Sequence, residues 1–330
     1  MQDNLTHCRV ILARPRGFCA GVVRAIDVVE RALQLYGAPV YVRHEIVHNR
    51  QVVERLRGLG AVFVEDIGDV PVGAITVFSA HGVSKKVEAA AAGRQLDIID
   101  ATCPLVRRVH REGQDYAARG YEILLVGHGG HAEVEGTQGQ IPVPVQVIST
   151  LADAEAIEVQ NPDKVAYVTQ TTLSLFDTQD IIAVLKRRFP AIAGPDTRDI
   201  CYATQNRQRS VLDLAAQVGA VLVVGCANSS NASRLQQIAG ETGVPSYLIE
   251  TPAMIETSWF AGVSSIGITA GASTPETVVQ DVVAHLATFL DIEVETMDGK
   301  QENVRFRVPD RLAAPRPTPA TAKASLQPAE

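Results

Sequence analysis

The chain has 330 residues, of which 46% are apolar, and a formal charge of −7 at neutral pH. A chain of this length buries a large core and is expected to form two or three domains. Its lysines and arginines are scattered, which argues against nucleic acid as a partner. No apolar run reaches the ~18 residues of a membrane span, and the N-terminus lacks a signal-peptide pattern. We therefore expect a cytoplasmic protein that acts on a small molecule, without membrane or nucleic-acid partners.

The chain begins with a segment that places a cysteine between a strand and a helix. A short apolar strand, Val10 to Ala13, leads through RGFCAGVVRAI and Cys19 into a helical pattern from Val22 to Leu35. The apolar positions of this pattern recur with a period of 3.6, as in an amphipathic helix. The strand APVYVRHEIVHN follows, and a later strand ends in the polar loop ITVFSAHGVS.

The same order of features recurs twice further along the chain. The second segment opens with LDIIDATCPLVRRVH and Cys103, continues through a helix ending near Gly120, and reaches the strand YEILLVGHGGHAEVEG. The third opens with TRDICYATQNRQRSVLDLAAQVG and Cys201, and reaches AVLVVGCANSSNASRL. Later strands end in VAYVTQTTLS and SIGITAGASTPE. Such internal similarity indicates repeated structural units, and the alternation of strands and helices indicates an α/β fold.

We therefore predict three pseudo-symmetric α/β units around a central metal or cluster. Their boundaries are 9–102, 103–200 and 201–290, and residues 291–330 form a C-terminal extension. The stretch beyond about 310 is rich in Pro and Ala with few large apolar groups, which predicts a disordered and dispensable tail.

The spacing between the cysteines and the polar strand ends supports the repeat. His48 follows Cys19 by 29 residues, His131 follows Cys103 by 28, and Ser229 follows Cys201 by 28. In open α/β sheets, ligands bind at the carboxyl ends of the strands. Each unit therefore supplies one cysteine and two polar loops to a shared site.

Three cysteines at equivalent places favour a metal centre over three separate packing residues. Isolated free cysteines are commonly small buried hydrophobes, and Cys8 and Cys226 lie outside the repeat. Three thiolates can hold a zinc ion with one open position, or three irons of a [4Fe-4S] cluster, which usually has four cysteine ligands. The residues alone leave both possibilities open.

The polar loops predict what such a centre would face. His48, His81 and His131 occupy equivalent strand ends, whereas we expect His44 and His128 to be structural or surface residues. The loops NSSNASRL and GASTPE combine hydroxyl and amide side chains with helix starts, and Ser273 to Glu276 fits a capping box. Helix N-termini bind anions, so the sequence predicts a diphosphate site.

Together these motifs resemble the 4-hydroxy-3-methylbut-2-enyl diphosphate reductase (LytB) family, an iron-sulfur family of isoprene biosynthesis by the methylerythritol phosphate pathway. The resemblance covers about residues 9 to 310. It rests on motifs from all three units: RGFCAGVVRAI, YVRHEIVHNR, FSAHGVS, DATCPLV, GHGGHAEVEGTQGQ, TQTTLS, DICYATQNRQ, NSSNASRL and TAGAS. Where the family commonly has His-Pro-Glu, this chain has His131-Ala132-Glu133, which keeps both functional side chains.

The resemblance implies a role for each candidate residue. Cys19, Cys103 and Cys201 would hold a [4Fe-4S] cluster whose fourth iron binds the substrate hydroxyl. Glu133 would be the proton source, with Thr171 near the hydroxyl-bearing carbon. His131 and Thr171 would serve both catalysis and substrate binding, and the diphosphate would be clamped by His48, His81, His131, Ser229, Ser230, Asn231 and Ser273.

The implied reaction removes the allylic hydroxyl with two electrons and two protons. It releases water and gives isopentenyl diphosphate and dimethylallyl diphosphate. The family suggests flavodoxin or ferredoxin as the electron donor. Two alternatives from other classes remain: a zinc-dependent hydrolase of a phosphorylated small molecule with Glu133 as base, and a non-catalytic sensor that uses the same cluster.

Overall fold

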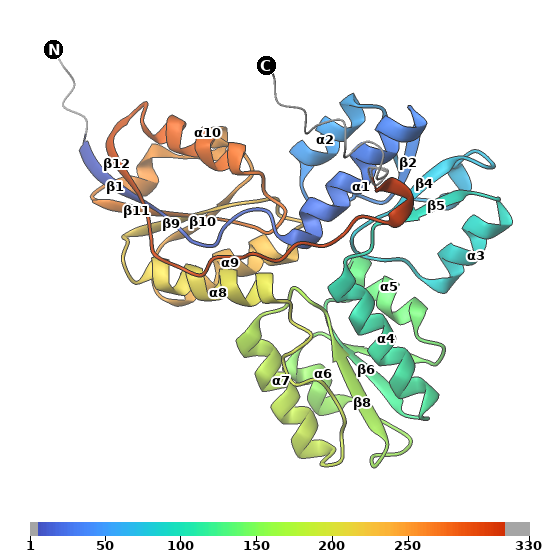
Figure 1. Ribbon diagram of the computed structural model, residues 1–330. Helices are drawn as coiled ribbons and strands as arrows, with labels where there is room; N and C mark the ends of the chain where they lie inside the picture. Colours follow the sequence, from blue (N-terminus) through green and yellow to red (C-terminus); the bar gives the residue numbers. More distant parts are fainter. Residues whose placement is uncertain (1–5, 314–330) are drawn as a thin grey trace, which may run out of the picture.

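The structure, a computed structural model, describes residues 6–313. It confirms the predicted α/β class, because its three sheets consist of parallel strands connected by helices. Figure 1 shows three lobes, each a small sheet flanked by helices, around a common centre. Parallel neighbours require crossover connections, and the helices provide them.

The first unit is a four-stranded sheet in the order β3-β2-β4-β5. Its central strand β2 pairs with β3 on one side and β4 on the other, and β5 extends the sheet beyond β4. The elements of this unit are α1 (Ala20–Tyr36), β2 (Val40–Arg43), α2 (Arg50–Gly58), β3 (Ala61–Val64), η1 (Ile67–Asp69), β4 (Ile75–Phe78), α3 (Lys85–Gly93) and β5 (Asp97–Asp100).

The second unit repeats this arrangement with three strands in the order β7-β6-β8. Its first strand β6 is again central, with the next strand on one side and the third on the other. Its elements are α4 (Pro104–Ala118), β6 (Glu122–Val126), α5 (Ala132–Gln140), β7 (Val145–Ile148), α6 (Leu151–Ala156), β8 (Val165–Thr169) and α7 (Leu175–Arg188).

The third unit has five strands in the order β10-β9-β11-β1-β12. Strand β9 takes the place of β2 and β6, between the second and third strands of its unit. The elements are α8 (Tyr202–Ala215), β9 (Ala220–Val224), α9 (Ser230–Glu241), β10 (Ser246–Ile249), η2 (Pro252–Met254), η3 (Thr257–Phe260), β11 (Ser265–Ala270), α10 (Glu276–Leu286) and β12 (Leu290–Thr296).

The first strand, β1 (Thr6–Leu12), belongs to the third unit and not to the first. It pairs in parallel with β11 and β12, which corrects the predicted boundary at residue 9 and gives β12, from the predicted extension, to the third unit. Val10 and Ile11 are buried on opposite faces of that sheet. A position between two other strands, with a core on each face, therefore removes both side chains from water. The chain therefore enters α1 from the third unit, as it enters α4 from β5 of the first.

Each sheet has an apolar cluster on both faces. The clusters on the two faces of the third sheet include Leu222 and Val223, and those of the second sheet include Leu124 and Leu125. Consecutive residues of a strand point to opposite faces, so continuous apolar runs such as AVLVV build two cores at once. The rigid sheets hold the loops at their carboxyl ends in fixed positions.

The C-terminal segment crosses from the third unit to the first (Figure 1). Its last described element is η4 (Asp310–Leu312), whose Leu312 is buried in the apolar core beside α1. The disorder predicted beyond about 310 therefore does not apply to this turn, because an apolar side chain anchors it. Residues 314–330, the rest of the predicted tail, lie outside the described residues.

Two local expectations also change. The predicted strand APVYVRHEIVHN ends at Arg43, so the residues from His44 to Asn49 form a loop. The predicted capping box from Ser273 to Glu276 is wrong, because α10 has Pro275 as its N-cap without a side-chain cap. The hydroxyl of Ser273 instead donates to the carbonyl of His48 at 2.9 Å, which joins the third unit to the first.

Candidate active site

The three repeat cysteines occur where the chain passes from one unit to the next. Each is the N-cap of a helix, with Cys19 before α1, Cys103 before α4 and Cys201 before α8. Each backbone N–H donates to a carbonyl of the unit that the chain has just left: Cys19 to Ala272 at 3.1 Å, Cys103 to Ala80 at 2.9 Å and Cys201 to Thr171 at 3.1 Å. The crossings therefore bring the three thiols to the centre of the molecule.

One cavity of about 110 Å³ contains all the site residues expected from the sequence. Cysteines from the three crossings form one part of its wall, and polar side chains from the loops form another. These lining residues are Cys19, Cys103, Cys201, His48, His81, His131, Glu133, Thr171, Ser229, Ser230, Asn231 and Ser273. The cavity is thus shared by all three units.

The thiols are close together and removed from water. A Cβ atom built on Gly21 would lie 2.8 Å from the Sγ of Cys103 and 3.8 Å from that of Cys19, so only glycine fits between them. Burial raises the pKa of Cys103 to about 12 and that of Cys201 to about 11, and the neighbouring Cys19 thiol adds to both shifts. Three thiolates at this place need a positively charged partner, which a metal or cluster provides.

Glu133 is a buried carboxyl group at the same cavity. Its Oε1 accepts a hydrogen bond from the backbone N–H of Thr171 at 2.6 Å, and its Oε2 accepts one from the Thr171 hydroxyl at 3.0 Å. Burial raises the pKa of Glu133 to about 7, although these two hydrogen bonds act in the opposite direction. The group can therefore hold a proton near neutral pH and release it.

Three histidine rings gather at the polar part of the cavity. The centroids of His48 and His81 are 4.2 Å apart, and that of His131 is 5.3 Å from His48 and 5.9 Å from His81. Burial lowers the pKa of His131 to about 4 and that of His81 well below its usual value, and the neighbouring histidines add to both shifts. At neutral pH, and without a bound anion, the rings of His81 and His131 are therefore uncharged.

The tautomer of His131 follows from its position as N-cap of α5. Its Nδ1 accepts a hydrogen bond from the backbone N–H of Glu133 at 3.1 Å. A neutral ring that accepts at Nδ1 carries its proton at Nε2, which can donate to a ligand. The same hydrogen bond closes the turn at Ala132, where the sequence lacks the proline common in the family it resembles.

Two buried nitrogens at the cavity have no hydrogen-bond partner among residues 6–313. They are Nε2 of His48 and Nδ2 of Asn231. Asn231 is held by its other side-chain atom, because Oδ1 accepts from the backbone N–H of Ala272 at 2.8 Å. Unpaired buried polar groups are costly, so their presence at a cavity indicates that a polar ligand completes them.

Ser229 and Ser230 add hydroxyl groups at the start of α9. The Oγ of Ser229 accepts from the backbone N–H of Ala232 at 3.4 Å and thereby caps the helix. Because the hydroxyl accepts this bond, its own proton stays available for a ligand. Capping and anion binding are therefore combined at one helix N-terminus.

The sequence-based reasoning missed two threonines at the cavity. The hydroxyl of Thr204 lies 3.2 Å from the Sγ of Cys201, and its backbone N–H donates to the same sulfur at 3.4 Å. Thr172 donates from its hydroxyl to Ser230 Oγ at 3.3 Å, which joins the second unit to the third. The position of Thr204, three residues after an N-cap, is a signal that could have identified it.

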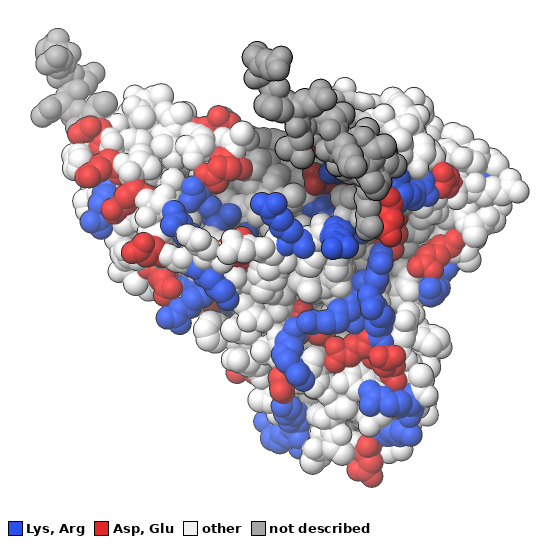
Figure 2. All heavy atoms as spheres, viewed as in Figure 1, with Lys and Arg blue, Asp and Glu red and all other residues white. Residues whose placement is uncertain are grey.

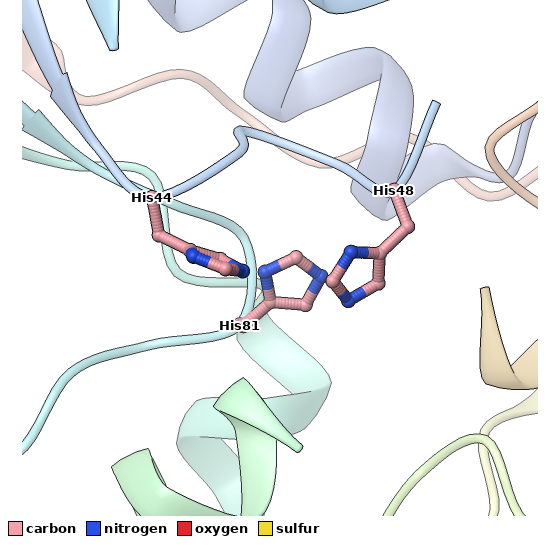
Figure 3. Close-up of side chains that lie close together, drawn as sticks. All are labelled: His44, His48 and His81. Carbon is pink, nitrogen blue, oxygen red and sulfur yellow. The ribbon is translucent and has the colours of Figure 1, made fainter. Parts of the chain in front are cut away.

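The other candidates lie outside this cavity. His128 is exposed, Cys8 is buried in an apolar cluster, and Cys226 is buried with its sulfur accepting a hydrogen bond from the backbone N–H of Arg50 at 3.4 Å. His44 also lies outside the cavity, and its ring lies 5.9 Å from both His48 and His81 (Figure 3). Among the described residues, no helix is long and apolar enough to cross a membrane.

Comparison with known proteins gives a consistent family. Residues 10–287 match the family model described as LytB protein. A 4-hydroxy-3-methylbut-2-enyl diphosphate reductase of Burkholderia pseudomallei is 57% identical over 304 residues, which cover 92% of this chain and 97% of that protein. One of Bradyrhizobium diazoefficiens is 53% identical over 305 residues, covering 92% of this chain and 99% of the relative.

A solved structure shows the same fold. The E-1-hydroxy-2-methyl-but-2-enyl-4-diphosphate reductase of Plasmodium falciparum superposes with a TM-score of 0.89 at 38% sequence identity. The match covers 93% of this chain and 97% of that one. The similarity therefore extends over all three units and not only over the motifs.

Proposed function

The chain belongs to the LytB protein family, and we propose from this premise how its central cavity carries out the family's reaction. Its activity is that of a 4-hydroxy-3-methylbut-2-enyl diphosphate reductase, an iron-sulfur oxidoreductase of isoprenoid precursor synthesis. The substrate takes up two electrons and two protons, its C–O bond breaks, and water leaves. The observation that carries the proposal is the convergence of three thiols, a carboxyl group of raised pKa and two unpaired side-chain nitrogens in one cavity.

Cys19, Cys103 and Cys201 fit a [4Fe-4S] cluster with three protein ligands. They are the three cysteines that line the cavity, and the missing side chain of Gly21 lets the sulfurs of Cys19 and Cys103 approach each other. Their place at helix N-termini favours the negative charge of a thiolate-ligated cluster. A bound cluster of this kind supplies electrons and a Lewis-acidic iron that has no cysteine ligand.

The polar part of the cavity fits the diphosphate. His131 donates from Nε2, Asn231 donates from its unpaired Nδ2, and the hydroxyls of the α9 N-terminus add further donors. His48 Nδ1 lies 3.2 Å from Glu45, so its unpaired Nε2 is the ring nitrogen left for a ligand. We propose His48, His81, His131, Thr171, Ser229, Ser230, Asn231 and Ser273 as the substrate-binding set. Holding the unreactive end positions the allylic alcohol and excludes water.

Glu133 is the proposed proton donor to the departing hydroxyl. Hydroxide is a poor leaving group, and protonation turns it into water. Thr171 is proposed to orient the carboxyl group, because both its N–H and its hydroxyl are hydrogen-bonded to Glu133. His131, two residues before Glu133, shares the catalytic role by placing its Nε2 proton at the substrate.

The electron donor is proposed to be a ferredoxin or flavodoxin that docks on the face seen in Figure 2. Lys and Arg side chains gather there over α4, α8 and the C-terminal segment. Helices α4 and α8 begin at Cys103 and Cys201. An acidic protein on this face would be steered by charge towards the two helices that begin at these proposed cluster ligands.

The function is tested first on anaerobically purified protein. We expect about four irons and four acid-labile sulfides per chain from the cluster type. The Mössbauer spectrum of one iron should change when substrate is added, and reduction should yield isopentenyl and dimethylallyl diphosphate. Zinc without sulfide would overturn the reductase mechanism in favour of the zinc-hydrolase alternative, which the relatives named above do not support. Cluster-dependent DNA binding without turnover would indicate the sensor.

A further inference from the structure

A second group of histidines overlaps the edge of the cavity. His44, His48 and His81 each offer one ring nitrogen, and these three nitrogens lie within 4.8 Å of one another. Figure 3 shows His81 between the other two rings, with ring nitrogens of His44 and His81 facing each other. His44 and His48 come from the loop after β2, and His81 comes from the loop after β4. Neighbouring strand ends thus bring together three metal-binding side chains.

Carboxylates orient two of the three rings. Nδ1 of His44 lies 2.8 Å from Glu65, and Nδ1 of His48 lies 3.2 Å from Glu45. An ionised carboxylate only accepts hydrogen bonds, so both Nδ1 atoms carry the proton and, in the neutral ring, both Nε2 atoms keep a lone pair. Metal-binding histidines are commonly oriented in this way by a carboxylate on the other nitrogen. The Nε2 of His48 has no partner within the described chain.

We propose that His44, His48 and His81 form a binding site for one Zn²⁺ ion, and that the ion inhibits the enzyme by occupying the nitrogens needed for the diphosphate. Three imidazoles with one open position are a known ligand set for zinc. Zinc–nitrogen distances of ~2.0–2.1 Å require nitrogens about 3.4 Å apart in a tetrahedral site. The ring nitrogens must therefore move closer to one another by up to about 1.4 Å, which rotation of the side chains provides.

The surroundings favour a cation and give it a path. An open pocket of about 370 Å³ lies beside His44 and His48. Three carboxylates, those of Glu45, Glu65 and Glu135, line it together with one cationic side chain, Arg43. Glu65 is 75% exposed, so this mouth opens to solvent away from the cysteines. Imidazole ligands select Zn²⁺ over Mg²⁺, which prefers oxygen. The site is therefore expected to take zinc while magnesium leaves it empty.

Competition with the substrate rests on the proposed function, because it requires His48 and His81 to bind the diphosphate. An Nε2 atom whose lone pair is on a metal cannot donate a hydrogen bond to a phosphate oxygen. The metal and the diphosphate consequently exclude each other at His48. His44 belongs to the zinc site alone. A variant at His44 therefore distinguishes zinc binding from diphosphate binding.

The binding experiment uses holoenzyme with its cluster, dialysed against free Zn²⁺ set by a metal buffer. We expect one zinc per chain and a zinc X-ray absorption spectrum with nitrogen or oxygen at about 2.0 Å, without sulfur at about 2.3 Å. His44→Asn should raise the Kd at least tenfold, because asparagine tolerates the positive φ of 61° at this position but does not replace an imidazole. Glu65→Gln should raise it about tenfold through loss of ring orientation.

The matched control is His7→Ala, which removes a histidine that is also paired with a carboxylate, Asp291, but has no imidazole neighbours. It should leave the Kd unchanged. Sulfur ligands in the spectrum, no stoichiometric zinc, or equal zinc binding by the His44→Asn variant would each overturn the site.

The inhibition experiment measures turnover at a series of fixed free Zn²⁺ concentrations. We expect zinc to raise the KM for the substrate without changing kcat, and His44→Asn to raise the inhibition constant at least tenfold while zinc-free kcat and KM stay within twofold. If zinc binds at this site but added substrate does not relieve the inhibition, the proposed competition is refuted. If the holoenzyme binds zinc at this site but does not turn over the diphosphate, the proposed function is refuted, whereas the metal site is not.

Discussion

The cysteine part and the polar part of the cavity are built by different rules. The three cysteines follow the three-fold repeat closely, since each is an N-cap at a crossing and each donates its backbone N–H to the preceding unit. The polar part departs from the repeat. The first and second units supply imidazoles, whereas the third supplies the hydroxyls and amide of Ser229, Ser230 and Asn231.

This difference shows what each part has to recognise. Three equivalent thiolates suit a compact cluster in which three irons each take one cysteine ligand, so repetition of one backbone arrangement is sufficient. A substrate with a charged end and a reactive end has no such symmetry. The units therefore share their backbone and differ in their side chains, and variants at the two parts should fail in different ways.

The largest effect is expected at the cysteine part. Cys103→Ser should lower iron and sulfide content and reduce turnover by roughly a thousandfold or more, because the redox group carries the chemistry. Metal analysis and a turnover assay check this on the same anaerobic sample. Cys8→Ser is the control, since Cys8 is fully buried away from the cavity. Loss of the cluster in that variant would show that the wrong cysteines have been assigned.

Glu133→Gln should separate the proton step from cluster binding. The amide keeps the shape of the side chain and can still bond to Thr171, but it cannot donate a proton to the leaving hydroxyl. We expect kcat to fall by about 10²–10⁴-fold with KM and iron content nearly unchanged. Glu135→Gln, on the exposed side of the same helix, is the matched control. Normal turnover by the Glu133 variant would remove it from the mechanism.

Asn231→Asp should damage the polar part alone. The aspartate keeps an oxygen for the Ala272 N–H but replaces the unpaired NH₂ donor with a negative charge. Losing a charge-assisted hydrogen bond and adding repulsion should raise KM by roughly 10–100-fold. The cluster spectrum should be unchanged. Asn161→Asp makes the same change at an exposed loop residue, whose Oδ1 also accepts a hydrogen bond from a backbone N–H. This control should leave KM unchanged. An equal KM in both variants would contradict the assignment.

The pH dependence of turnover should reflect the raised pKa of Glu133. In the proposed mechanism the protonated carboxyl is the active form, and burial raises its pKa to about 7. Activity should therefore be retained below that pH and fall about tenfold per unit as the pH rises above it. Rate profiles of the wild type and Glu133→Gln, compared over the same range, check this. An identical high-pH decline in both would assign the ionisation to another group.

The smallest effect is expected at Thr204. Thr204→Val removes the hydroxyl beside the Cys201 sulfur but keeps the backbone N–H that also donates to it. Hydrogen bonds to cluster sulfurs favour the more negative, reduced state. The reduction potential should therefore become slightly more negative, with turnover reduced less than about tenfold. Potentiometry checks the shift, and Thr204→Ser should restore the original potential. An unchanged potential in Thr204→Val would show that this hydroxyl does not act on the cluster.

The recurring order of helix, strand and polar loop was predictable because it depends on local order along the chain. The intervals of 28 or 29 residues from each cysteine to His48, His131 and Ser229 reflect one helix and the strand after it, whose combined length is nearly the same in each unit. The pairing of β1 with β11 was not predictable in this way. It joins residues more than two hundred positions apart, and it arises only when the three units pack around a common centre.

The sequence by itself determined which side chains could meet, since the α/β pattern places a cysteine and two polar loops at the same edge of each unit. Only the tertiary structure decided their properties. Burial raises the pKa of Glu133, the Glu65 carboxylate orients His44, and the first unit brings His44 to His48 and His81. Local periodicity follows from backbone geometry, whereas desolvation and pairing depend on neighbours contributed by distant parts of the chain.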